Sequence, residues 1–211
     1  MRTLTKAVIV GGATLFAGWI GWGIYSTRKA ESVPYERVGT LNGFELRHYP
    51  QMVLVETSAS TQRTAFRRLF EYISGANQGE ESISMTAPVE TQGGTSVQMT
   101  TPVRSESARS DADELRMAFY LPSEYDSEAA PEPTDPNIEL VTEPSKTVVV
   151  DRFSWYAPEW RVTRRERNLL STLEREDVEQ VGSPSLLRYN DPWTPPFLRR
   201  NEVAVPVSDT A

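Results

Sequence analysis

Apolar side chains recur with a helical period between Arg63 and Ile73, in the segment around which the predicted fold is organised. Positions 65, 66, 69, 70 and 73 are apolar, whereas Arg63 and Arg67 fall on the other face. This is the pattern of an amphipathic helix with one buried side. Gly75 follows, and glycine supplies the left-handed turn that often ends a helix. The pattern therefore predicts a helix over 63–73.

Alternating apolar and polar positions predict strands on both sides of this helix. Two runs flank Asn42-Gly43, and an Asn-Gly pair between alternating segments is the strongest short-range signal for a hairpin. The predicted strands are 35–39, 44–49, 52–58, 115–121, 146–153, 185–189 and 202–207. Residues 115–121 alternate in the manner of a strand with one buried face. A second amphipathic helix is predicted over 164–174, where three leucines share one side.

Two near-copies of one phrase follow the first helix: Met85-Thr-Ala-Pro-Val89 and Met99-Thr-Thr-Pro-Val103. The Gly93-Gly94 pair between them suits the tip of a hairpin. Proline removes a ladder donor, so we expect each phrase to bend at its proline. Helices separated by antiparallel runs indicate an α+β fold, in which both helices cover one face of a curved sheet. The order of elements resembles two copies of one unit.

Residues 7–25 contain no charged side chain. Nineteen residues in a helix reach roughly 28 Å, close to the hydrocarbon thickness of a bilayer. Trp19, Trp22 and Tyr25 gather towards the end of the stretch, where aromatic rings favour the headgroup level. We expect residues 1–30 to hold one uncleaved transmembrane helix and residues 31–211 to form one domain. A cleaved signal peptide, whose apolar core is usually shorter, and a buried or surface helix are the alternatives.

Two basic residues precede the charge-free stretch and two follow it. The positive-inside comparison therefore leaves the membrane side of the domain open. Ala13, Ala17 and Gly21 form a small-xxx-small row that would allow weak self-association through the anchor. Glycine is common in membrane helices anyway, so this row is equally consistent with an anchor that does not associate.

The charge balance and the numbers of cysteine and histidine residues argue against several classes of function. The first thirty residues carry four positive charges and no negative one, which leaves 18 basic against 29 acidic side chains in the remainder. A domain with this excess of acidic side chains binds the phosphate backbone of nucleic acids poorly, so we expect no nucleic-acid partner. The chain has no cysteine and one histidine, so thiolate and disulfide chemistry is excluded and catalytic triads lack support. We therefore expect a binding protein and not an enzyme.

Six phrases resemble the SOUL haem-binding protein family. They are Tyr35-Glu36, Glu45-Leu-Arg-His-Tyr-Pro50, Ala65-Phe-x-x-Leu-Phe-x-Tyr-Ile-Ser-Gly-Ala-Asn77, Met85-Thr-Ala-Pro-Val89, Met117-x-Phe-x-Leu-Pro122 and Tyr189-Asn-x-Pro-x-Thr-Pro-Pro-x-x-Arg-Arg-Asn-Glu-Val203. The resemblance covers about residues 34–207. It implies a distorted antiparallel β-barrel with two flanking helices, built as a pseudo-duplicated unit. It also implies reversible, non-covalent binding of haem or another porphyrin, as a carrier or buffer.

The resemblance directs attention to His48, which occupies the position of a histidine proposed as an axial iron ligand in some members. A neutral imidazole is a standard haem ligand, although a structural histidine on a strand explains this position too. Arg63, Arg67 and Arg68 are candidates to pair with haem propionates, because a guanidinium fork matches a carboxylate. A solvated helix face explains them equally. Met85 and Met99 are candidates to line an apolar pocket or to pack in the core.

The sequence leaves two questions open: the role of three tryptophans, and the alternatives to tetrapyrrole binding. Trp155, Trp160 and Trp193 lie in or beside loops, where large aromatic side chains wall a groove or cover the ends of a barrel. The alternative functions are binding of another amphipathic small molecule, a protein-interaction module, and a hydrolase-like enzyme on the same architecture. The last is an analogy with gyrase-inhibitor-like domains only.

Overall fold

The computed structural model describes residues 19, 21, 31–92, 115–190 and 193–209. Within these ranges the chain forms a large antiparallel sheet, a short parallel pair and two helices, which confirms the α+β class. The strands are β1 (Glu31–Ser32), β2 (Glu36–Leu41), β3 (Phe44–Tyr49), β4 (Met52–Ala59), β5 (Thr86–Ala87), β6 (Val89–Gln92), β7 (Leu115–Tyr120), β8 (Glu139–Glu143), β9 (Lys146–Phe153), β10 (Ser185–Arg188) and β11 (Asn201–Val207). The helices are α2 (Gln62–Ile73) and α3 (Glu159–Arg175), with a 3-10 helix η1 (Pro196–Leu198).

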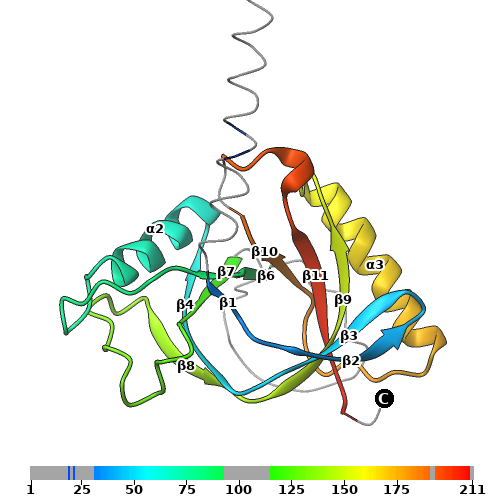
Figure 1. Ribbon diagram of the computed structural model, residues 1–211, viewed down its shortest axis with the longest axis horizontal. Coiled ribbons are helices and arrows are strands. Elements are labelled where there is room, and N and C mark those ends of the chain that lie inside the picture. The colour runs from blue at the N-terminus through cyan, green and yellow to red at the C-terminus, as the bar shows by residue number, and fades with distance from the viewer. Residues whose placement is uncertain (1–18, 20, 22–30, 93–114, 191–192, 210–211) are drawn as a thin grey trace, which may run out of the picture.

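The large sheet is strongly curved, and it is open. Its strands run in the order β2-β3-β9-β11-β10-β6-β7-β4-β8. A closed barrel requires its first and last strands to pair, but among the described residues β2 pairs only with β3 and β8 only with β4. The expected distorted barrel is therefore wrong in this respect. The curvature brings the two halves of the sheet to face each other, while both edges stay unpaired (Figure 1).

Both helices cover the outer face of this curve, as predicted (Figure 1). Helix α2 lies on β4 and β7, and α3 lies on β9 and β11. Under α3, Leu169 and Leu173 join a cluster with Val149 and Val205. In the large sheet, β2 to β4 precede α2, and the four strands β6 to β9 lie between α2 and α3. The duplicated unit expected from the sequence stays a prediction.

The inner face of the curve is buried as well. Leu54, Tyr120, Val150 and Leu187 form a second core between the two halves of the sheet. The prediction of one buried face for residues 115–121 is therefore wrong, because Ala118 and its neighbour on that face, Tyr120, are both buried. Curvature, and not a covering helix, excludes water from this side.

Local signals set the hairpin and the helix ends. Asn42 and Gly43 adopt φ values of 48° and 89°, which the right-handed twist of a two-residue hairpin favours. The Thr61 hydroxyl accepts a hydrogen bond from the Thr64 N–H at 3.2 Å and caps α2. Gly75 has φ 111° just after the helix, a conformation that side chains disfavour. The predicted hairpin and helix stop are both confirmed.

Helix α2 differs from its prediction in which side chains it buries. Ala65, Leu69 and Ile73 are buried as expected. Phe66 and Phe70 were assigned to the same buried side, but they are 39% and 47% exposed. Period alone misplaced them because they lie at the margin of the apolar stripe, next to the arginine face.

Of the twin phrases, only the first lies within the described residues. It is split into β5 and β6, with a cis peptide bond between Ala87 and Pro88 at the break. This agrees with the bend expected at proline. The second phrase, which includes Met99, and the Gly93-Gly94 tip fall outside the described ranges.

The predicted membrane stretch, residues 7–25, also lies outside the described residues except for Trp19 and Gly21. Searching the described part of the chain finds no helix with the length and apolarity needed to cross a membrane. The anchor therefore stays a prediction from sequence.

Candidate functional site on helix α2

Two stacked phenylalanines form an exposed aromatic surface on α2. The ring centroids of Phe66 and Phe70 lie 5.9 Å apart with an interplanar angle of 14°. Phe66 also contacts the buried Phe119 edge-on at 5.4 Å, so the surface is anchored to the core. Rings held in this way offer a flat apolar platform that loses little side-chain entropy when a ligand stacks on it.

Two arginines lie beside this platform. Arg63 precedes Phe66 by three positions, and Arg67 precedes Phe70 by three, so each pair shares one side of the helix. Arg67 is within 3.9 Å of Glu71, with both side chains mostly exposed, and ion pairs of this kind contribute little to stability. Helix α2 therefore carries apolar rings and guanidinium groups on adjacent stripes.

Of the two candidate methionines, only Met85 lies within the described residues. Met85 is 39% exposed and directly precedes β5. The Ile83 N–H donates to the Ile73 carbonyl at 2.8 Å, so this segment passes the C-terminal end of α2. Met85 follows this contact by two positions in the sequence. Met99 is outside the described residues.

His48 lies elsewhere, on β3. Its register partner on β9 is Thr147, and the Nδ1 atom of His48 lies 3.1 Å from the Thr147 hydroxyl oxygen. Side chains alternate along a strand, so His48 shares the outer face with Leu46, which packs in the cluster under α3. His48 and the α2 surface therefore belong to different halves of the molecule, and one ligand cannot be assigned to both from this geometry.

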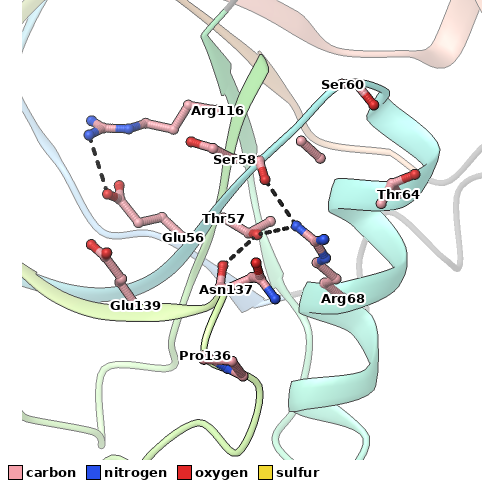
Figure 2. Close-up of a pocket in the computed structure, with 11 residues that line it drawn as sticks. Glu56, Thr57, Ser58, Ser60, Thr64, Arg68, Arg116, Pro136, Asn137 and Glu139 are labelled. Carbon is pink, nitrogen blue, oxygen red and sulfur yellow. Dashed lines mark hydrogen bonds and ion pairs between the residues drawn. The ribbon is translucent and has the colours of Figure 1, made fainter. Parts of the chain in front are cut away.

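A polar hollow of about 480 Å³ lies on the other flank of α2 (Figure 2). Arg68 reaches from the helix to β4, where it donates to the Ser58 carbonyl at 3.0 Å and lies 3.5 Å from the Thr57 hydroxyl. Arg116 pairs with Glu56 at 3.4 Å. Burial raises the pKa of Glu56, and nearby carboxylates add to this against the opposing effect of Arg116. The lining is too polar for an apolar macrocycle.

The inner face of the sheet holds a buried ion network. Arg47 and Glu202 are fully buried, with the Arg47 Nη1 atom 2.7 Å from the Glu202 carboxylate. Glu202 also accepts hydrogen bonds at 2.8 Å from Arg200 and from the Tyr189 hydroxyl. Burial alone would raise the pKa of Glu202, but the bonds from Arg47 and the charge of Arg200 outweigh it and hold the pKa below its ordinary value. The network is satisfied internally and stabilises the fold.

Free space on this inner face is small. A cavity of about 10 Å³ lies between Tyr49, Glu90 and Tyr120, which is the size of one water molecule. The Tyr120 hydroxyl donates to the Glu90 carboxylate, and burial together with that carboxylate raises the pKa of Tyr120 well above its ordinary value. A macrocycle would not fit here, so the exposed surface of α2 is the better candidate.

Metal binding by side chains alone has no support in the described ranges. No group of three or more histidine, cysteine, aspartate or glutamate side chains gathers there in a way that could hold an ion.

The sequence predicted Arg63, Arg67 and Met85 as site residues but not the phenylalanine platform or the polar hollow. Arg68 was also a candidate for haem propionates, but the structure places it in that hollow, bonded to the Ser58 carbonyl. A signal for the platform was present, because Phe66 and Phe70 are four residues apart and each follows an arginine by three. No comparable signal marked the hollow, which depends on the fold bringing Asn137 beside β4.

Comparison with known proteins agrees with this fold. The family described as "SOUL heme-binding protein" matches residues 30–206. Mouse Heme-binding protein 1 is 25% identical over 182 residues, which cover 86% of this chain and 88% of the mouse protein. Heme-binding protein 1 of Xenopus tropicalis is 28% identical over 166 residues, with coverage of 76% and 81%. A crystal structure of the EcmrR C-terminal domain has a TM-score of 0.53 at 13% identity and covers 82% of this chain and 98% of that one. This last likeness concerns the fold alone.

Proposed function

The chain belongs to the SOUL heme-binding protein family, and from this premise we propose that it binds haem or a related tetrapyrrole, reversibly and without a covalent bond, on the outer surface of α2. The observation that carries the proposal is the stacked, exposed pair Phe66 and Phe70 beside Arg63 and Arg67. The relatives are named haem-binding proteins, which is consistent with binding and not catalysis.

The chemistry of this surface suits an amphipathic, planar ligand. A porphyrin is a flat apolar ring with carboxylates at one edge, so stacking on Phe66 and Phe70 would remove apolar area from water. Arg63 and Arg67 would receive the carboxylates through charge-assisted hydrogen bonds. Met85 would contribute a polarisable side chain near the end of the helix. None of these contacts requires iron.

His48 is the second candidate, as an axial ligand to iron. Its Nδ1 atom faces the Thr147 hydroxyl, so Nε2 is the nitrogen that an iron would use. His48 lies on the outer face of the half of the sheet that α3 covers. Ligation there would therefore place the haem away from the α2 surface. The two proposals therefore make different predictions about iron.

We also propose that residues 7–25 anchor the chain in a membrane as a single span. The support is the charge-free length and the aromatic residues at its end. An anchored binder would act as a carrier or buffer at the membrane, where amphipathic ligands concentrate. The side of the membrane stays open.

The test is titration of the full chain in detergent with hemin and, separately, with iron-free protoporphyrin. We expect saturable spectral changes with both ligands and similar affinities if α2 is the site. Arg63→Gln with Arg67→Gln should weaken binding by roughly two- to thirtyfold, because exposed charge pairs contribute about 0.2–1 kcal/mol each. The matched control is Arg164→Gln with Arg167→Gln on α3, where both arginines are also exposed. Equal affinity in the two double variants, or no saturable change, would refute the α2 proposal.

The same titration tests His48. If it ligates iron, hemin should bind more tightly than the iron-free ring, and His48→Ala should shift the Soret band. A Soret band that is unchanged in His48→Ala would remove the ligand role and leave the α2 surface in place. Competition by an unrelated amphipathic compound with equal affinity would instead favour the broader ligand class.

A further inference from the structure

Five large aromatic side chains are exposed together at one end of the domain, where the loop before α3 meets the loop before β11. They are Trp155, Tyr156, Trp160, Trp193 and Phe197, with exposed fractions from 41% to 78%. The Trp155 N–H donates to the Pro196 carbonyl at 2.9 Å, and Figure 1 shows the segment before β11 next to the first turn of α3. We call these five residues the aromatic end. Single exposed apolar residues are ordinary, but a cluster of this kind marks an interaction surface.

The backbone at this end is strained at one of these aromatic residues. Trp155 has φ 73°, a left-handed conformation that costs a residue with a side chain about 1–2 kcal/mol. The Asn201 side chain donates to the Trp155 carbonyl at 2.8 Å and holds the turn. The indole itself is 53% exposed, so burial in the core does not explain the conformation.

One described residue of the charge-free N-terminal stretch contacts the domain at the same end. Trp19 lies within residues 7–25, and its indole N–H donates to the Trp193 carbonyl at 2.8 Å. The loop of Trp193 is therefore beside Trp19. If the stretch lies in a bilayer, the aromatic end lies at its surface.

Charge at the aromatic end differs from that of the whole domain. Residues 31–211 hold 18 basic and 29 acidic side chains. Apart from Arg200, which pairs with the buried Glu202, residues 154–161 and 193–200 hold two arginines, Arg161 and Arg199, and one glutamate. The guanidinium of Arg199 lies 4.8 Å from the Tyr156 ring centroid. Basic residues interleaved with aromatic rings suit the phosphates and the apolar boundary of a lipid headgroup layer.

We propose that the aromatic end is a membrane-contact surface, with Trp155, Trp160 and Trp193 at the headgroup level beside the anchor. Tryptophan and tyrosine prefer this level because one side of each ring is apolar and its tip is polar. The proposal rests on the anchor proposed above and adds an orientation to it. The C-terminal end of α3 then points away from the bilayer.

The test uses site-specific labels on the full chain, which contains no cysteine. Glu159→Cys places an environment-sensitive fluorophore in the first turn of α3 and keeps all five aromatic residues. Glu179→Cys is the matched control, because both glutamates are exposed and α3 separates them by roughly 25 Å. The labelled chains are reconstituted in vesicles of phosphatidylcholine and phosphatidylglycerol that contain a lipid with a nitroxide on its headgroup.

We expect the label at position 159 to shift to shorter wavelength and lose most of its emission, while the label at position 179 keeps its emission. Trp155→Ser, Trp160→Ser and Trp193→Ser in one chain should remove this quenching, although the chain still floats with the vesicles. If the triple variant does not fold, as judged by circular dichroism, Trp160→Ser alone should reduce the quenching.

Equal emission from both labels on vesicles that carry the chain would overturn the membrane-contact proposal and leave the anchor intact. A chain that does not float with the vesicles would overturn both. Protection of position 159 only on native membranes, without quenching by the nitroxide lipid, would assign the aromatic end to a protein partner and also overturn it. None of these three results bears on tetrapyrrole binding, which the titration in detergent measures separately.

Discussion

Glu202→Gln is expected to be strongly destabilising, because it removes one charge from a fully buried ion pair. Glu202 accepts hydrogen bonds from Arg47 at 2.7 and 3.1 Å, from Arg200 at 2.8 Å and from the Tyr189 hydroxyl at 2.8 Å. Arg47 and Glu202 are both completely inaccessible to solvent. Glutamine keeps the shape but leaves the Arg47 charge without its buried partner.

Breaking a buried pair by removing one partner costs about 3–5 kcal/mol. Arg47 also pairs with Glu45, whose side chain is 29% exposed, so part of the compensation survives. We therefore expect about 3 kcal/mol, at the lower end of that range. For a domain of this size the melting temperature should fall by roughly 6–12 °C.

The pH dependence supplies an independent check. The pKa of Glu202 is below its ordinary value of 4.5, so its contribution is present above pH 4.5 and is lost as the pH falls through the folded-state pKa. The difference in stability between the two proteins should therefore be constant near neutral pH and should shrink in acid. Glutamine does not titrate, so the variant lacks this contribution.

The assay is thermal unfolding of the full chain in detergent, followed by circular dichroism at neutral pH and in acid. Replacing both partners, with Arg47→Met and Glu202→Leu, should cost less than Glu202→Gln, because no unpaired charge remains. A loss below about 1 kcal/mol, the range of exposed ion pairs, would refute the reasoning. So would a difference that stays the same down to the lowest pH at which the protein is folded.

Three further substitutions test the local structure by the same unfolding assay. Asn77→Ala should cost about 2–3 kcal/mol, because the buried side chain makes four hydrogen bonds to backbone atoms; a loss no larger than that of the exposed Gln78→Ala would contradict this. Leu169→Ala, at a fully buried position, should cost about 2–5 kcal/mol and more than Leu170→Ala, and the reverse order would argue against the packing of α3. Gly75→Ala should cost about 1–2 kcal/mol, because φ is 111°; a neutral result would count against that conformation.

Much of the fold follows from local signals that need no partner. The Asn42-Gly43 turn and the apolar run of 146–153 specify their own conformations, and the structure places a hairpin and strand β9 there. Strand β8 was not predicted, because Glu139–Glu143 carries acidic residues and follows a proline-rich loop. Its place depends on pairing with β4, which is a tertiary contact.

Burial was harder to predict than secondary structure. Along β3, alternation placed Arg47 opposite the apolar residues, which would normally mean exposure to solvent. The curvature of the sheet buries that side too, and the structure shows that Glu202 accepts a hydrogen bond from Arg47 there. Local periodicity carries no information about a partner that lies 155 residues away in sequence.

At the candidate site, burial was also mispredicted, but here side chains expected to be buried are exposed. Phe66 and Phe70 satisfied the helical period and were therefore predicted to be buried, but both side chains are more than a third exposed. The arginines beside them were identified from sequence. Their proximity to an exposed platform was not, because the sequence contains no measure of how much of a helix its sheet covers.

The most direct test of the central claim is the hemin affinity of Phe66→Ser combined with Phe70→Ser, measured by Soret titration of the full chain in detergent. The control is Trp155→Ser combined with Trp160→Ser, which removes two exposed rings from the aromatic end. Aromatic contacts contribute about 0.5–1.5 kcal/mol each, so the α2 variant should bind about tenfold more weakly while the control keeps the affinity of the unchanged chain. An α2 variant that folds and binds hemin as tightly as the control would contradict a tetrapyrrole site on this helix.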